Sequence, residues 1–101
     1  MKLVMVTSVE DFHNEILQLF NQAGIQNFSE SGIQGYKNAP SLLSSSNWFA
    51  ANKSATNSIM IFSFTQTEKI DKLFSLLEEF NQNLETNNPV KAIVLPIERH
   101  L

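Results

Sequence analysis

The stretch "SIMIFSFTQTEKIDKLFSLLEEF", residues 58–80, predicts a strand that passes directly into a helix. Residues 58–65 are apolar and rich in β-branched and aromatic side chains, which is typical of a buried strand. The sequence "TQTE" that follows fits a capping box, in which Thr65 and Glu68 each satisfy a backbone N–H at the start of a helix. Apolar side chains then recur at helical spacing: Ile70, Leu73, Phe74, Leu77, Phe80 and Leu84.

A similar unit stands at the beginning of the chain. Residues 2–7, "KLVMVT", form a continuous apolar run that predicts another buried strand. Residues 9–24 predict a helix, because Glu10 and Asp11 suit its first turn and Gly24 suits the position just after its end. Its apolar positions are Phe12, Ile16, Leu19, Phe20 and Ala23.

Two further strands complete the pattern. Residues 25–36 predict a half-exposed strand with a bend, and residues 90–97 predict a last strand in which Pro96 favours a sheet edge. The order of elements is then βαββαβ. This order predicts an α+β, ferredoxin-like domain with a four-stranded antiparallel sheet and two helices on one face.

The second face of this sheet has no helix to cover it. In residues 59–64, side chains that point to one face alternate with side chains that point to the other. Both groups are largely apolar, so the strand presents apolar side chains on both faces. A monomer would leave one of these faces in water. The pattern therefore predicts self-association.

The bulk composition limits the classes of function. The 101 residues fit a single domain, and a net charge of −3 argues against a nucleic-acid surface. There is no cysteine, and we find no signal peptide and no apolar run long enough to span a bilayer. We therefore expect a cytoplasmic protein with no direct membrane insertion and no nucleic-acid partner.

Chemical motifs are sparse. The sequence contains no nucleophile elbow, no thiol, no H-E-x-x-H and no Walker loop, so we expect a protein that is not an enzyme. The two histidines, His13 and His100, are weak candidates for a divalent metal. Glu10 stands three residues before His13, and Glu98 stands two residues before His100. A surface histidine without a metal is the commoner case.

Two stretches resemble a known family. "AGIQNFSESGIQGYK", residues 23–37, resembles the helix-to-strand passage of PII-type signalling proteins, where an "iG…MTvseVkGfG" pattern leads into a long loop. "KAIVLPIERHL", residues 91–101, resembles their last strand, "kIFVlPVeeaiRI". The resemblance implies a PII-like homotrimer with its sheets packed inward, and a T-loop at about residues 37–57.

The resemblance also implies a ligand site. PII-type proteins bind adenine nucleotides in clefts between subunits, and the matching positions here are Ser29, Gly35, Tyr36 and Lys37. Their glycine-rich phosphate loop is replaced by "LETNNPVK", residues 84–91, in which Lys91 retains one cation. The implied ligand is thus a small anion, with an adenine nucleotide as the first candidate. A divalent metal ion is a separate and less favoured candidate ligand.

The segment 37–57 contains the only tryptophan. Trp48 and Phe49 stand among small polar residues, which offer too few apolar contacts to offset the entropy cost of ordering the loop. We expect the loop to be mobile in the free protein and to use these two aromatics as anchors for a regulated protein. By family analogy that partner is a membrane transporter. The alternative is that both rings are buried locally or in the trimer cleft.

Other families share this order of elements, and the sequence alone leaves them open. One is the divalent-cation-tolerance family, which is also trimeric and keeps a metal-binding role under consideration. The others are dimeric ferredoxin-like monooxygenases and ACT-type amino-acid-sensing modules.

Overall fold

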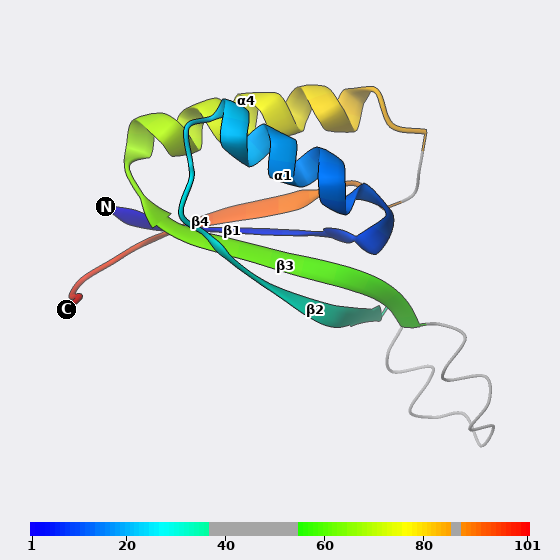
Figure 1. The fold of residues 1–101 in the computed structure, drawn as a ribbon, viewed down its shortest axis with the longest axis horizontal. Coiled ribbons are helices and arrows are strands. Elements are labelled where there is room, and N and C mark those ends of the chain that lie inside the picture. Colours follow the sequence, from blue (N-terminus) through cyan, green and yellow to red (C-terminus); the bar gives the residue numbers. More distant parts are fainter. Residues whose placement is uncertain (37–54, 86–87) are drawn as a thin grey trace, which may run out of the picture.

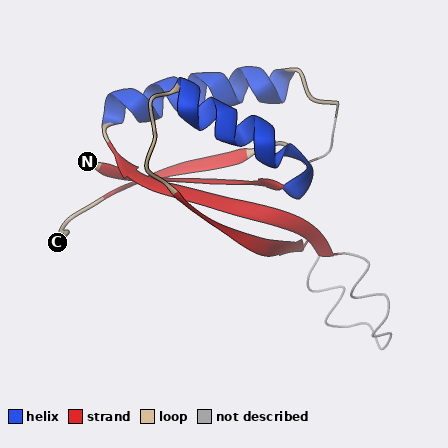
Figure 2. Cartoon of the chain, viewed as in Figure 1, coloured by secondary structure: helices blue, strands red, loops and turns tan. Residues whose placement is uncertain are grey.

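The computed structural model describes residues 1–36, 55–85 and 88–101 (Figure 1). Four strands form one antiparallel sheet in the order β2-β3-β1-β4, and both helices cover the same face of it (Figure 2). This is the ferredoxin-like α+β fold that the sequence predicts. In chain order the elements are β1 (Lys2–Val9), the 3-10 turn η1 (Glu10–Phe12), α1 (His13–Gln22), β2 (Ser29–Tyr36), β3 (Ala55–Thr65), α4 (Thr67–Gln82) and β4 (Lys91–Pro96).

The core lies between the sheet and the two helices. In the central strands every second side chain points toward the helices, and Val6 of β1 stands opposite Ile61 of β3. Both side chains are buried, as is Phe20 of α1. The buried apolar cluster is made of Val4, Val6, Ile16, Phe20, Ala23, Ile25, Ile59, Ile61, Ile70, Leu73, Leu77 and Val90.

Helix α1 ends as the sequence predicts. Gly24 follows the helix with φ of +81°, a conformation that costs glycine little. Its N–H donates to the carbonyl of Asn21, and the N–H of Ile25 donates to the carbonyl of Phe20, both at 3.0 Å. These two bonds form a Schellman motif, which satisfies the carbonyls of Phe20 and Asn21 in the last turn of the helix.

The predicted capping box at the start of α4 is wrong. The helix begins at Thr67, its N-cap is Gln66, and no side chain makes a capping hydrogen bond there. Thr65 is instead the last residue of β3, where it stands opposite Lys2 of β1. Thr65 is therefore part of the sheet and is not the N-cap residue of α4.

Three strand boundaries differ from the predicted ones. β2 begins at Ser29, because residues 25–28 form a connection in which Ser63 Oγ donates to the carbonyl of Asn27 at 2.6 Å. β3 begins at Ala55, so the predicted loop 37–57 overlaps the strand by three residues. β4 is shorter than predicted, and Pro96 closes it on a sheet edge, as expected.

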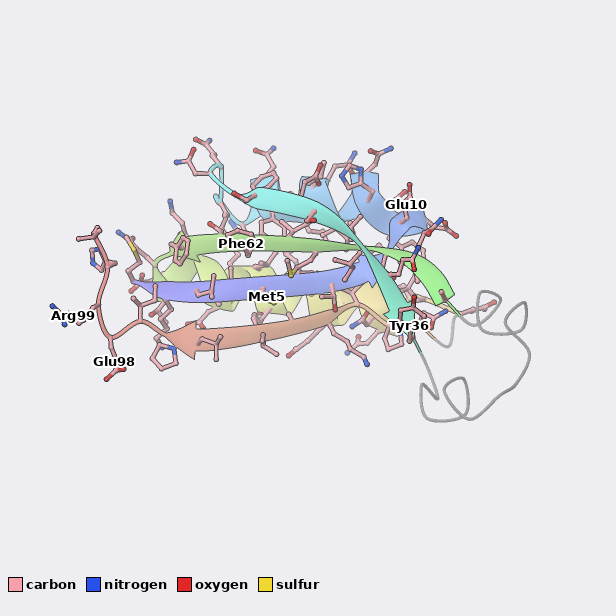
Figure 3. The ribbon with its side chains drawn as sticks, turned by 90° about the horizontal axis from the view of Figure 1, so that it is seen from below. Met5, Glu10, Tyr36, Phe62, Glu98 and Arg99 are labelled. Carbon is pink, nitrogen blue, oxygen red and sulfur yellow. The ribbon has the colours of Figure 1, made fainter. Side chains whose placement is uncertain are left out.

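The second face of the sheet carries no helix among the described residues (Figure 3). We call this surface the uncovered face, and Met5 and Phe62 stand near its centre. The side chains of Phe64, Ile93 and Leu95 are 56%, 51% and 45% exposed there. The predicted apolar second face is confirmed. Its apolar members include Leu3, Met5, Met60, Phe62, Phe64, Ile93 and Leu95.

Candidate functional site

A hollow of about 210 Å³ lies where β2 ends and β3 begins. We call it the strand-end hollow. Its wall combines hydroxyl groups, a few apolar side chains, one amide and one amine. The described residues that line it are Thr7, Ser8, Val9, Ile33, Gly35, Tyr36, Thr56, Ser58, Asn88, Pro89 and Lys91.

The sheet register brings these residues together. Ser58 of β3 stands between Val9 of β1 and Ile33 of β2 in the antiparallel ladders. On the far side, Lys91, the first residue of β4, stands opposite Thr7 of β1. The hollow therefore spans the ends of all four strands, and residues far apart in the sequence share its wall.

Gly35 keeps this hollow open. It stands opposite Thr56 on β3, and a Cβ atom built at position 35 would lie 3.2 Å from Ser58 Oγ. Such a separation is tight, so a side chain here would push against the wall. Glycine at this position thus leaves space that a ligand can enter.

The chemistry of the wall suits a small anion. Among the described lining residues Lys91 is the only charged one, and its ammonium group is a compact positive charge with three donors. The hydroxyls of Thr7 and Thr56 can each donate a hydrogen bond to an anionic oxygen. The Ser58 hydroxyl already donates to the Thr56 carbonyl at 3.2 Å. Tyr36 is 54% exposed, and its hydroxyl donates to Gln34 Oε1 at 2.9 Å.

The structure unites three of the residues expected from the family resemblance and separates a fourth. Gly35, Tyr36 and Lys91 all line the strand-end hollow. Ser29 stands opposite Phe62 at the start of β2, six positions before Gly35. At about 3.3 Å per strand residue this separation is roughly 20 Å, so Ser29 is not part of the hollow in a single chain.

Three other predicted residues lie outside the described part of the chain. These are Lys37, expected at the ligand site, and the expected partner anchors Trp48 and Phe49.

The two candidate metal-ligating histidines lie apart. His13 Nε2 is 2.6 Å from Glu30 Oε2, which links the start of α1 to β2. His100 belongs to the C-terminal segment beyond β4, at the end of the molecule opposite η1 (Figures 1 and 3). Within residues 1–36, 55–85 and 88–101 no group of three histidine or carboxylate side chains is placed to hold a metal ion.

Sequence reasoning missed the hydroxyl groups of the hollow. Thr7 and Ser58 each stand at the end of an apolar run, where a polar residue is easily taken for the end of a strand. The available signal was their placement: once the strands are paired antiparallel, the last residue of one run lies beside the first of the next. Thr56 gave no such signal, because it was assigned to the loop.

These features define a ferredoxin-like domain with one uncovered sheet face and a polar hollow at the end of that face. No protein-family model matches the sequence, and no curated protein matches it. The fold is similar to the crystal structure of a protein from Thermus thermophilus that is described as a PII-like signaling protein. The TM-score is 0.63 at 14% identity, over 95% of this chain and 85% of that one. The PII-like fold expected from the sequence is thereby confirmed.

None of the described helices is both long and apolar enough to cross a bilayer.

Proposed function

We propose that this chain is a PII-like regulatory protein that binds a small anionic ligand in the strand-end hollow. The main support for the proposal is that Gly35, Tyr36 and Lys91 line the same hollow. The first two come from the edge strand β2 and the third from the opposite edge strand β4. The glycine supplies space, the lysine supplies charge, and the neighbouring hydroxyls supply hydrogen-bond donors.

The proposed working form is a homotrimer in which the uncovered faces pack together. More than half of the Phe64 side chain is exposed in a single subunit, and Ile93 and Leu95 lie exposed on the same face. Exposed apolar patches of this kind commonly mark protein interfaces. The strand-end hollow opens at the end of this face, so a neighbouring subunit can supply another wall. Ser29 joins the proposed site only across such a subunit boundary.

The proposed output is the segment of residues 37–54, which connects the end of β2 to the start of β3. Tyr36, which precedes that segment, and Thr56, which follows it, both line the hollow. A ligand bound there can therefore affect the segment that carries Trp48 and Phe49. We propose that these aromatics bind a regulated protein, with a membrane transporter as the first candidate to test.

Calorimetric titration of the purified protein with ATP, ADP, AMP and cyclic nucleotides tests the ligand proposal. We expect saturable binding of at least one of them, with one site for each subunit. If a protein that still self-associates binds none of these nucleotides, a nucleotide-sensing role is refuted. A second series with divalent metals compares the wild type with a His13→Ala, His100→Ala double variant, and binding that only the wild type shows would favour the metal alternative.

A further inference from the structure

Asn81 makes a two-way hydrogen bond with the backbone of Val90. Its Nδ2 donates to the Val90 carbonyl at 2.9 Å, and the Val90 N–H donates to its Oδ1 at 2.8 Å. Asn81 lies in the last turn of α4, and Val90 immediately precedes β4. The carboxamide thus behaves as a neighbouring strand would, since it exchanges both bonds with a single residue.

The hydrogen bonds from Asn81 hold a residue that the β-ladder does not reach. The ladder between β1 and β4 begins at Lys91, opposite Thr7, so Val90 lies outside it. Val90 is nevertheless buried, with 6% of its surface exposed, and its side chain belongs to the core. Its backbone groups need partners at such a site. Asn81 provides both of them.

The position of Val90 determines the direction of the next residue. Successive side chains of a strand point to opposite faces. Because the Val90 side chain enters the core on the helix side, the Lys91 side chain is directed to the uncovered face, where it lines the strand-end hollow. Pro89, on the other side of Val90, has a fixed φ and lines the same hollow.

We propose that Asn81 is a positioning residue for the ligand site. It binds Val90, which is not among the residues that line the hollow, and through Val90 it fixes the amine of Lys91 on the wall. This inference rests on the proposed function for its ligand-binding part. Its structural part, that Asn81 holds the start of β4, is independent of any ligand.

Amide hydrogen exchange measured residue by residue tests the structural part. In Asn81→Ala the Val90 amide loses its acceptor, and we expect it to exchange at least about tenfold faster, the order of one lost hydrogen bond. Amides of the β1–β3 ladder should keep their rates. Gln82→Ala is the matched control, because Gln82 is the next residue of the same helix and is exposed. An unchanged rate at Val90 would overturn the proposal.

Calorimetry with whichever of ATP, ADP, AMP and the cyclic nucleotides the wild type binds most tightly tests the ligand-binding part. We expect Asn81→Ala to weaken binding about tenfold while the thermal unfolding transition stays cooperative. The double variant with Lys91→Ala should bind no more weakly than Lys91→Ala alone, since both changes act through one amine. Additive losses would show that Asn81 does not act through Lys91, and would overturn the assignment.

Failure of the proposed function and failure of the structural role of Asn81 give different results. If the wild type binds no nucleotide, the proposed function fails for this ligand class, and the exchange rate at Val90 alone decides whether Asn81 holds the strand. If Asn81→Ala does not fold, Asn81→Asp serves in its place. Aspartate keeps the acceptor for the Val90 N–H but loses the donor to the Val90 carbonyl. In that variant faster exchange at the Lys91 end of β4 supports the proposal, and wild-type exchange contradicts it.

Discussion

Phe62 and Phe64 lie edge to face on the uncovered face of the sheet, with their ring centroids 6.1 Å apart. In the ladder with β1, Phe62 stands opposite Met5 and Phe64 stands opposite Leu3. The two rings therefore belong to a continuous apolar surface that crosses the central strands. Aromatic side chains contribute strongly to interfaces because they remove a large area from water.

The first prediction concerns self-association. Replacement of Phe64 by Glu should convert the proposed trimer into a monomer, because it would place three carboxylates in an apolar interface. The fold should persist, since Phe64 is 56% exposed in one subunit. Sedimentation velocity at micromolar concentration measures the change, with circular dichroism to check the fold. Glu79→Lys, an exposed position on α4, is the control and should sediment like the wild type. A monomeric wild type would contradict the trimer.

The second prediction concerns the charge in the strand-end hollow. Lys91→Ala should weaken the binding of an anionic ligand by about tenfold or more, because it removes the only charged side chain among the described lining residues. Stability should change little at this exposed site. Calorimetric titration measures the affinity, and Lys72→Ala, on the exposed side of α4, serves as the control. Equal affinities for the two variants would place the ligand elsewhere.

The third prediction concerns the space in the hollow. Gly35→Val should weaken ligand binding. A Cβ atom added at this position would lie 3.2 Å from Ser58 Oγ, and the rest of the valine side chain would fill the strand-end hollow. Gly32→Val is a matched control on the same strand, since a Cβ at position 32 meets no atom within 4 Å. The two variants are compared in the same titration. If both bind as the wild type does, the hollow is not the site.

The fourth prediction concerns the end of α1. Gly24→Ala should lower the free energy of unfolding by about 1–2 kcal/mol, because its φ of +81° is unfavourable for a residue with a Cβ. The space itself is adequate, as the nearest atom would be Lys69 Cε at 3.8 Å. Urea denaturation measures the loss. Gly32→Ala, without a positive φ, should be close to neutral, and an equal loss there would contradict the backbone explanation.

Much of the fold could be predicted because short-range patterns determine it. The alternation of Ile59 and Ile61 with Met60 and Phe62 indicates a strand with two apolar faces, and the structure confirms both faces. Gly24 marks the end of the first helix for a local steric reason. The order of the elements then leaves few topologies, since crossover connections are right-handed.

The features that could not be predicted from the sequence depend on contacts between residues that are far apart in the chain. The pairing of Asn81 with Val90 spans a connection whose course local pattern does not predict. Thr65 fits a capping motif locally, but its pairing with Lys2 in the sheet prevents that role. The family resemblance located Gly35 and Lys91 at the hollow, but not the hydroxyls beside them, because no motif marks those positions.

The last prediction concerns the contact between His13 and Glu30, which lie 17 positions apart and join α1 to the edge strand β2. Their side chains are 34% and 44% exposed, so water competes for the bond despite its 2.6 Å length. We expect a double-mutant cycle with His13→Ala and Glu30→Ala to give a coupling free energy of about 0.2–1 kcal/mol. Urea denaturation at low and high salt measures it, and the coupling should decrease with salt if the pair is charged. A coupling above about 2 kcal/mol would mean that the pair is far better shielded from water than its exposure indicates.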